Sequence, residues 1–400
     1  MEQKNLVPKR RFKEFQNASA WEQRAVSELA DRYDNFRIPI TASNRVAGST
    51  PYYGANGIQD YVEGFTHDGE FILVAEDGAN DLQNYPVHYV NGKVWVNNHA
   101  HVLQAKSEIA DNKFLMNAMK YMNIEPYLVG GGRSKLNADV MMKISFRVPE
   151  LAEQKLIGSF FASLDHLITL HQRKLEKMKA LKSAYLSEMF PAEGERVPKR
   201  RFAGFTQAWE QRKLGEMMEV TSVKRIHQSD WTDEGVRFLR ARDIVCASKG
   251  EEPTDYLYIS QEKYDEYSRI SGKVKVGDLL VTGVGTIGVP LLVTQEEPLY
   301  FKDGNIIWFK NEKKLDGNFF YYSFIGESIQ KYIRDVAGIG TVGTYTIDSG
   351  KKTPIQIPSY EEQEKIGNFF KQLDHLITLH QRKLKKLQNI KKAYLNEMFV

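Results

Sequence analysis

Two groups of residues have the types and spacing of chemical sites. GVGTIG at Gly283–Gly288 fits the G-x-G-x-x-G pattern of loops that hold a dinucleotide or S-adenosylmethionine. Such a loop must be followed by a helix, whereas VPLLV has the composition of a strand, so we predict a hairpin here. His99 and His101 share one face of a predicted strand, but no cysteine or carboxylate pair stands beside them, which disfavours a metal site.

Other catalytic signatures are missing from the sequence. It contains no G-x-x-x-x-G-K-[ST] phosphate loop, and YPVHY is the nearest approach to the Pro-Pro-aromatic motif of amino-methyltransferases. Cys246 is the single cysteine, which rules out an internal disulfide or a multi-cysteine zinc site and fits a reducing compartment. We therefore predict a chain with no catalytic residues, no metal and no cofactor of its own.

The composition is that of an ordinary globular protein. The chain has 400 residues, 42% hydrophobic and 26% charged, which is enough for two or three domains. It has no apolar signal segment at its start and no run of about 18 apolar residues. We expect a cytoplasmic protein that does not enter a membrane.

A long internal repeat is the strongest feature. LDHLITLHQRKL occurs at Leu164–Leu175 and again, without a change, at Leu373–Leu384, an offset of 209 residues. Upstream, VPKRRF and WEQR each occur twice as well. Residues 25–147 and 213–356, which lie between these repeats, share no evident text. A solenoid repeats every 20–50 residues, so we interpret the chain as two similar frames that carry two different blocks.

Each frame contains a long predicted helix. Apolar positions are spaced alternately by four and three residues in both copies, which is typical of a coiled-coil seam. The predicted seam consists of Leu164, Ile168, His171, Leu175, Met178 and Tyr185, and of Leu373, Ile377, His380, Leu384, Leu387 and Tyr394. A histidine on such a seam more often sets the register than binds a ligand.

The two helices are expected to pack on each other, because neither stripe is stable in water. The short connection after Pro191 favours an antiparallel pair, about 50 Å long, with the blocks at its ends and a pseudo-two-fold relation between them. Membership in an ordinary helical bundle is the alternative.

The charges are distributed unevenly along the chain. The first helix carries six basic and three acidic residues and the second eight basic and three acidic ones, so the two helices have a net charge of +8. Because the whole chain has a net charge of +4, the residues outside the helices sum to −4. Basic helices are often merely solvated, and blocks with this charge should bind DNA weakly alone.

The two blocks are predicted to be mixed α+β domains. Short β-branched and aromatic runs alternate with Gly, Asn and Asp, VNGKV (90–94) predicts a hairpin, and helices are expected near 112–123 and 318–335. We divide the chain into a first recognition domain with its tail (1–147), a central helix (148–190), a second recognition domain with the repeated tail (191–356), and a C-terminal helix (357–400).

Each block has a Gly-rich polar loop shortly before its long helix, GGGRSKLN and GIGTVGTYTI. Backbone amides in such loops approach phosphates closely, although ordinary turns use the same residues. Arg suits guanine and Asn suits adenine, so we select exposed polar and aromatic side chains as candidate DNA readers. They are Tyr52, Tyr53, Asn56, Arg133, Ser134 and Lys135 in the first block, and Arg240, Arg242, Lys302, Thr341 and Tyr345 in the second.

These residues together resemble the specificity subunits of type I restriction–modification systems. The resemblance rests on PKRRF…WEQRKLGE, PYYGANGI, KVGDLLVTGVGTIG and EEQEKIGNFFKQLDHLITLHQRKL, and it spans nearly the whole chain. It is most specific in the tails and helices and weaker inside the first block.

The resemblance implies a non-catalytic reader of double-stranded DNA. Each block would be a target recognition domain for half of a bipartite site, and the helices would set the gap and dock two methyltransferase subunits. Those subunits would bind S-adenosylmethionine and methylate adenine, and separate restriction subunits would use ATP and Mg and cleave unmethylated DNA.

Two other classes of function are also compatible with parts of the sequence. A stand-alone nuclease or methyltransferase with a fused reader would need the motifs that are missing here, and it would bind S-adenosylmethionine or a divalent metal. A coiled-coil adaptor with no role on DNA would leave two unlike, loop-rich domains unexplained.

Overall fold

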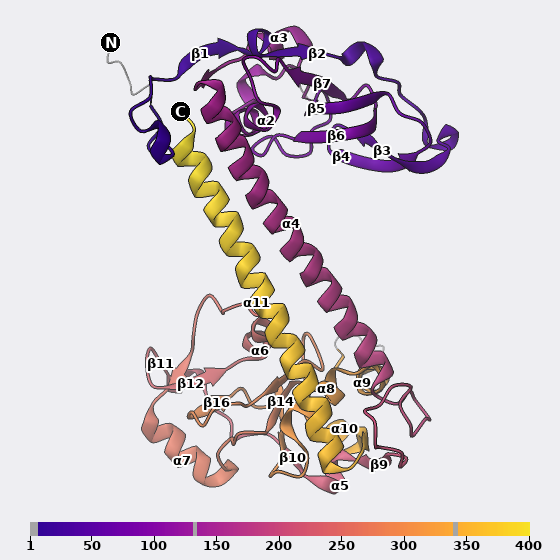
Figure 1. Cartoon of the computed structure of the whole chain (residues 1–400). Helices are drawn as coiled ribbons and strands as arrows, with labels where there is room; N and C mark the ends of the chain where they lie inside the picture. Colours follow the sequence, from indigo (N-terminus) through magenta and orange to yellow (C-terminus); the bar gives the residue numbers. More distant parts are fainter. Residues whose placement is uncertain (1–6, 131–133, 339–342) are drawn as a thin grey trace. The chain divides into compact units, whose positions relative to one another are not determined.

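The computed structural model describes residues 7–130, 134–338 and 343–400. The chain divides into two compact units, one of residues 1–173 and 381–400, the other of residues 174–380. Two long helices, α4 (Leu151–Glu188) and α11 (Tyr360–Met398), contribute to both units, as Figure 1 shows. We call these unit 1 and unit 2 and describe each by itself.

Unit 1 is built on a six-stranded sheet in the order β2-β7-β5-β6-β3-β4. Its neighbouring strands are antiparallel except for β3 and β6, which are parallel. The strands are β2 (Ala30–Arg32), β3 (Ala47–Gly54), β4 (Gly57–Val62), β5 (His67–Ala75), β6 (Val87–Val96) and β7 (Ala100–Ala105). Short 3₁₀ helices lie at Lys13–Phe15, Asp34–Phe36, Ala42–Asn44 and Glu125–Tyr127.

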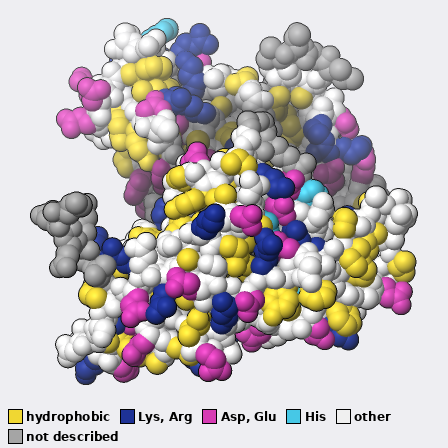
Figure 2. Space-filling model, turned by 90° about the horizontal axis from the view of Figure 1, so that it is seen from above, with side chains coloured by type: hydrophobic (Ala, Val, Ile, Leu, Met, Phe, Trp, Pro, Cys, Tyr) yellow, Lys and Arg dark blue, Asp and Glu magenta, His cyan; other side chains and the backbone are white. Residues whose placement is uncertain are grey.

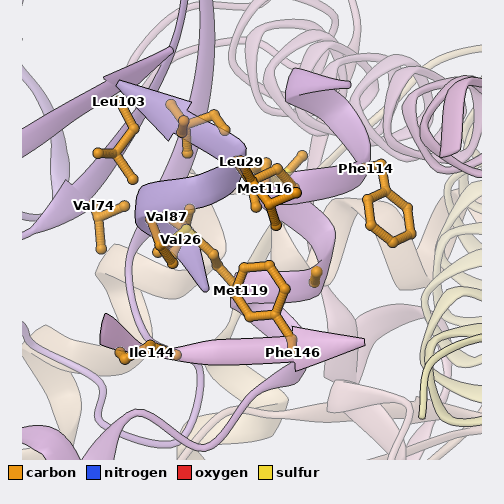
Figure 3. Packing of buried hydrophobic residues seen from close by; sticks show 14 of the residues in the cluster. Val26, Leu29, Val74, Val87, Leu103, Phe114, Met116, Met119, Ile144 and Phe146 are labelled. Carbon is orange, nitrogen blue, oxygen red and sulfur yellow. The ribbon is translucent and has the colours of Figure 1, made fainter. Parts of the chain in front are cut away.

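Both faces of the central strands β5 and β7 of this sheet are largely buried, whereas much of β3 and β4 is exposed. Helices α1 (Val26–Leu29), α2 (Asn112–Tyr121) and α3 (Ala138–Lys143) supply residues to the larger core, to which Val74, Phe114 and Met119 belong (Figure 3). Leu73, the neighbour of Val74 on β5, belongs to a separate cluster. Successive side chains of a strand point to opposite faces, so the apolar run of β5 supplies two cores at once.

Unit 2 contains two four-stranded sheets, β10-β17-β14-β15 and β11-β13-β12-β16. The strands are β10 (Glu219–Thr221), β11 (Trp231–Thr232), β12 (Val236–Leu239), β13 (Tyr258–Ile259), β14 (Leu279–Thr282), β15 (Pro290–Leu292), β16 (Leu299–Phe301) and β17 (Ile306–Lys310). The helices are α5 (Leu214–Met217), α6 (Ala241–Lys249), α7 (Gln261–Ser271), α8 (Gly317–Ile325), α9 (Glu327–Ala337) and α10 (Ile347–Lys352), with a 3₁₀ turn at Gln228–Asp230.

The repeated tails hold the blocks through equivalent strand pairs. In unit 1, β1 (Glu22–Ala25) pairs antiparallel with β8 (Ser145–Val148), the strand before α4. In unit 2, β9 (Glu210–Lys213) pairs in the same way with β18 (Pro354–Ile357), the strand before α11. Each block therefore starts and ends at a two-stranded ribbon whose first strand comes from the repeated tail.

A buried ion pair fixes each tail to the first turn of a long helix. Arg11 contacts Glu153 through two donors, with 4% and 0% of the two side chains exposed. Its equivalent, Arg201, donates to Glu362 at 2.8 and 2.7 Å. Two parallel N–H···O bonds fix the orientation of both groups, so the tail cannot slide along the helix.

Close backbone packing joins a block helix to each long helix. Asp111 caps α2 by accepting a hydrogen bond from the amide of Phe114 at 2.8 Å, and Asp316 caps α8 in the same way. A Cβ on Gly158 of α4 would lie 2.4 Å from Asp111 Oδ1, and one on Gly367 of α11 would lie 2.3 Å from Asp316 Oδ1. Glycine inside these helices is required by this approach.

In each unit, α4 and α11 pack antiparallel through equivalent contacts (Figure 1). In unit 1, Lys391 Nζ lies 2.5 Å from Asp165 Oδ1, and the rings of Phe160 and Tyr394 are 5.1 Å apart. In unit 2, Lys182 Nζ lies 2.6 Å from Asp374 Oδ1, and Tyr185 and Phe369 are also 5.1 Å apart. All twelve predicted seam residues occupy buried or half-buried positions.

Three local predictions have different outcomes. GVGTIG connects the antiparallel strands β14 and β15, so the predicted hairpin is confirmed. VNGKV does not turn: it lies within β6, where Gly92 (φ +93°) opposes Gly69 (φ +140°) of β5, and these paired glycines let the ladder continue. The helix predicted near 318–335 is divided at Gly326, an extended residue between α8 and α9.

The fold class predicted from the sequence is confirmed. Both blocks are mixed α/β domains, and each is attached to a pair of long antiparallel helices by a repeated set of contacts. The sheets themselves differ, since one block has a six-stranded sheet and the other has two four-stranded sheets.

We predict that breaking one buried ion pair destabilises only its own unit. Glu153→Gln leaves the Arg11 guanidinium buried without a counter-charge and should cost about 3 kcal/mol of unfolding free energy. Hydrogen exchange should show faster opening at the tail and β1 in this variant, and Glu362→Gln should act in the same way at β9. The double variant Arg11→Met/Glu153→Met should recover part of the loss. Wild-type exchange rates in Glu153→Gln would contradict the prediction.

Candidate nucleic-acid interface

Three loops of unit 1 converge beside the Gly-rich segment. The loop after β5 and the segment before α3 are joined by isolated bridges of Lys135 to Asp77 and to Val129. Asn56, in the β3–β4 turn, donates from Nδ2 to the carbonyl of Gly78 at 2.9 Å and accepts from the amide of Asn80. The predicted readers Asn56 and Lys135 therefore hold the same loop from two sides.

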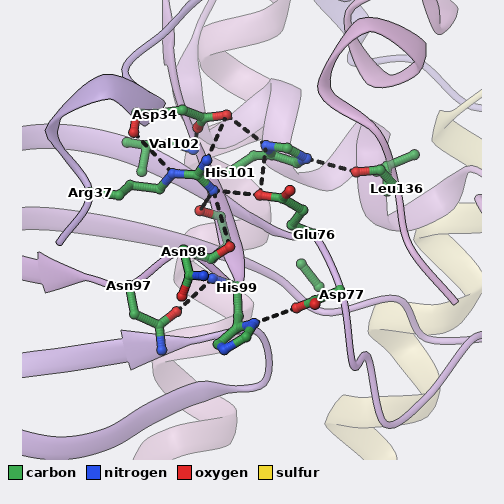
Figure 4. A network of polar contacts seen from close by, with 12 residues as sticks. Asp34, Arg37, Glu76, Asp77, Asn97, Asn98, His99, His101, Val102 and Leu136 are labelled. Carbon is green, nitrogen blue, oxygen red and sulfur yellow. Dashed lines mark hydrogen bonds and ion pairs between the residues drawn. The ribbon is translucent and has the colours of Figure 1, made fainter. Parts of the chain in front are cut away.

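A network of charged side chains supports these loops (Figure 4). Lys135 Nζ lies 2.9 Å from Glu76 Oε1, and Arg37 Nη1 donates to Glu76 Oε2 at 2.6 Å. His101 contacts Asp34 at 2.7 Å through Nδ1 and the carbonyl of Leu136 at 2.8 Å through Nε2. The Gly-rich segment is thus tied to strand β7 and to the loop after β2.

The electrostatics of the network favour the ionised carboxylates. Burial alone would raise the pKa of Asp34, but the hydrogen bond from His101 and the charge of Arg37 outweigh it and lower that pKa. For Glu76, burial is likewise outweighed by hydrogen bonds from Arg37 and Lys135, and the pKa is lowered. The loops consequently rest on fixed negative charges, and one of these charges, Glu76, is paired with Lys135, whose side chain is 46% exposed.

The other candidates of the first block are less accessible than predicted. Tyr52 was expected to be exposed, but only 1% of it is, and its hydroxyl bonds the backbone of Ile40 while the Arg45 guanidinium lies 4.2 Å from its ring centre. The expectation of an exposed Tyr52 is wrong, because alternate residues of β3 face the core. Tyr53 and Ser134 are half-buried, and Arg133 lies outside the described residues.

In the second block, two arginines share one acidic partner. Arg240 Nη1 lies 2.8 Å from Asp255 Oδ2, and Arg242 contacts the same carboxylate. Arg240 is also paired with Asp243 at 2.9 Å, which fixes it at the start of α6, whereas 56% of the Arg242 side chain is exposed. Arg242 is therefore the more accessible of the two.

The remaining candidates of the second block do not form one group. Lys302 is half-buried, and its amide donates to the carbonyl of Leu239. Tyr345 is only 2% exposed and its hydroxyl is 2.5 Å from Thr353 Oγ1, so the side chain selected as a reader is a core residue. Thr341 lies outside the described residues.

Sequence reasoning missed Asp34, Arg37 and Glu76, which position the loops. Asp34 and Arg37 lie three residues apart, whereas Glu76 lies 39 residues further on, so only the folded chain brings Glu76 to the other two. Of the two histidines on one face of the predicted strand, His99 contacts Asp77 and His101 contacts Asp34. Within the described ranges, no group of three or more His, Cys, Asp or Glu residues is arranged to hold a metal ion.

The surface charges are mixed. Figure 2 shows basic and acidic side chains interspersed across the face in view. This distribution agrees with the small net charge of +4. None of the helices in the described part of the chain has the length and apolar character to cross a membrane.

Comparisons with known proteins identify close similarity at the level of family. Residues 18–180 and 206–389 match the family model described as type I restriction modification DNA specificity domain. A putative type I restriction enzyme specificity subunit of Haemophilus influenzae is 33% identical over 89% of this chain and 88% of its own length. The type I restriction enzyme MjaVIII specificity subunit of Methanocaldococcus jannaschii is 25% identical over 74% of this chain and 71% of its length.

A solved structure has the same fold. The type I restriction–modification system S subunit from M. genitalium aligns over 98% of this chain and 99% of its own, with a TM-score of 0.68 and 15% sequence identity. Both repeats of the chain are covered by the family match, so the two blocks are relatives of one domain type.

We predict that His88 of β6 makes unit 1 sensitive to mild acid. Burial, followed by the charge of Lys120, lowers the pKa of His88 to about 4 from 6.5. A histidine with a lowered folded pKa takes up its proton more readily when unfolded, so stability falls as the pH drops from about 6.5 towards 4. Thermal unfolding should show a shallower pH dependence over that window in His88→Gln than in wild type. The control His166→Gln removes an exposed histidine and should leave the slope unchanged; equal slopes in all three proteins would refute the prediction.

Proposed function

The chain belongs to the type I restriction–modification specificity family, and from this premise we propose that it reads a bipartite DNA target and docks the partner subunits of the complex. It is a non-catalytic specificity subunit that recognises DNA sequence through two domains. The observation that carries the proposal is the duplicated frame: the same ion pair, the same capped helix and the same ribbon hold two unlike blocks.

Each block would read one part of the target. In the first, we propose that Asn56, Ser134 and Lys135 act at the DNA surface, with Tyr53 beside them and Tyr52 as a buried support. In the second block, Arg242 is the leading candidate, since its exposed guanidinium suits guanine and its ion pair with Asp255 fixes its orientation. Arg240 and Lys302 would assist at the phosphates.

Partners would supply what this chain lacks. The regions outside the long helices carry a net −4, whereas phosphate neutralisation provides most of the non-specific affinity for DNA. We propose that two methyltransferase subunits and the restriction subunits supply the remaining contacts with the DNA phosphates. These subunits would also bind S-adenosylmethionine, ATP and Mg, while this chain binds none of these. Its action on cellular DNA would take place in the cytoplasm.

The long helices offer a surface for those partners in both units. Leu167 and Leu170 of α4 are 41% and 38% exposed. The equivalent residues of α11, Leu376 and Leu379, are 42% and 37% exposed. An exposed apolar pair on identical sequence in both units suits a partner that binds twice, and we propose that each pair docks one methyltransferase subunit.

Sequencing of methylated DNA tests the reading function. The chain, co-expressed with a methyltransferase subunit, should direct adenine methylation at a split motif with two specific parts around a fixed gap. Replacing residues 25–147 with the corresponding block of the Haemophilus relative should change one part and leave the other. Methylation at one continuous motif, or a swap that alters neither part, would overturn the bipartite proposal.

Introducing negative charges at the leucine pairs tests the docking function. Leu167→Asp/Leu170→Asp and Leu376→Asp/Leu379→Asp should each reduce the methyltransferase content from two subunits to one, and the combination should leave none, measured by native mass spectrometry. Gln172→Asp and Gln381→Asp place the same charge on exposed polar positions and should keep two subunits bound. Full complexes with the leucine variants would exclude these surfaces.

A further inference from the structure

Unit 1 contains a cavity of about 740 Å³ between its block and its helix pair. Its walls include the loop before β6, the end of α2, and the unit 1 parts of α4 and α11. Three lysines line it, Lys120, Lys391 and Lys392, together with two aspartates, Asp81 and Asp165. The volume lies within the range of small-ligand sites.

The two aspartates are already satisfied. Asp165 is paired with Lys391 at 2.5 Å. Asp81 accepts hydrogen bonds from the amides of Gln83 and Asn84 and from the Asn84 side chain, all at 2.9 or 3.0 Å. Asp165 and Lys391 therefore compensate each other, while Asp81 keeps its charge. Lys120 and Lys392 against Asp81 leave the cavity lining with a net charge of +1.

Lys120 shares its nearby counter-charge, Asp165, with Lys391, and it is Lys391 that forms the ion pair. Lys120 is half-buried at the end of α2, and the ion pairs of the described residues do not include it. Burial, and next the charge of Lys391, lower the pKa of Lys120. An anion in the cavity would offset both effects, since it would stabilise the ammonium in a poorly hydrated place.

A second polar group of the cavity lacks a partner. His88 lines the wall, and its Nε2 atom is buried with no hydrogen-bond partner in the described structure. A buried ring nitrogen without a partner is costly, and a ligand in the cavity that bonds to it would remove that cost.

The frame itself does not require this cavity. In unit 2, Ile325 stands nine residues after the capping Asp316, as Lys120 does after Asp111. There the hydroxyl of Tyr322 donates to Asp374 Oδ2 at 2.7 Å, whereas Asn117, the counterpart of Tyr322, bonds within its own helix. The lysine is thus a property of the first block, added to a frame whose other copy uses apolar and aromatic residues.

We propose that this cavity is a binding site for a phosphate group, with Lys120 as its central cation. Lys392 and the amide side chains of the α11 wall, Gln388 and Asn396, supply further donors for the oxygens of a phosphate. The phosphate belongs either to the DNA backbone next to the first half-site or to a free nucleotide. Only the DNA source rests on the proposed function.

Thermal unfolding of the full chain tests the site without DNA. Potassium phosphate and AMP should raise the Tm of wild type above the values in KCl and adenosine at equal ionic strength. Lys120→Met, which keeps the apolar stem, should weaken the affinity for phosphate about tenfold. This is the effect expected from the loss of roughly one charge-assisted hydrogen bond. Lys385→Met removes an exposed lysine of α11 outside the cavity and should respond as wild type does.

DNA binding by the assembled complex identifies the source of the phosphate. If the DNA backbone occupies the site, Lys120→Met should lower the slope of log K against log salt by about 0.9 and leave the methylated motif unchanged. If a nucleotide occupies it, that slope stays as in wild type while the AMP response is lost. Equal responses of Lys120→Met and Lys385→Met in both assays overturn the proposal. A wild-type complex that reads no split motif would instead refute the proposed function, and the Tm assay would still stand.

Discussion

The structure depends on an aromatic side chain at the end of each long helix. Phe399, after α11, packs in unit 1 with Trp21, Phe114 and Phe161, at ring distances of 6.2, 5.4 and 5.9 Å. Phe190, after α4, packs in unit 2 with Trp209, Phe319 and Phe370 at 6.1, 5.8 and 6.0 Å. Each cluster is completed by a residue from the opposite half of the sequence. Neither half of the chain therefore contains all of its own core, although the halves arose as copies.

This constraint explains which parts of the fold could be predicted from the sequence. The identical amino-acid sequences around Leu164 and Leu373 are expected to form the same structure twice. A regular spacing of apolar residues indicates helices that pack together. Three of the twelve seam positions are buried and nine are half-buried, which agrees with that inference. The glycines at positions 158 and 367 were visible only as exceptions within a helix, since the aspartates they approach lie far away in the sequence.

The site was less predictable for a physical reason. Strand alternation decides whether an aromatic residue faces solvent, and the register of β3 was not evident from its composition, so Tyr52 was misjudged. Tyr345 was misjudged similarly, because a loop rich in glycine still places one large side chain in the core. Asp34, Arg37 and Glu76 contribute through long-range contacts, and single residues with such roles leave no periodic signal.

The paired ribbons have a genetic consequence. The chain enters and leaves each block on adjacent antiparallel strands, with Glu22 opposite Val148 in one unit and Glu210 opposite Ile357 in the other. Crossovers in the gene at these two points exchange a whole block and keep the Arg11–Glu153 and Arg201–Glu362 ion pairs. The capping aspartates Asp111 and Asp316, which pack on the long helices, are exchanged with the block. A single recombination event can thus replace one whole block, provided that the incoming block brings an equivalent capping aspartate for the glycine of the long helix.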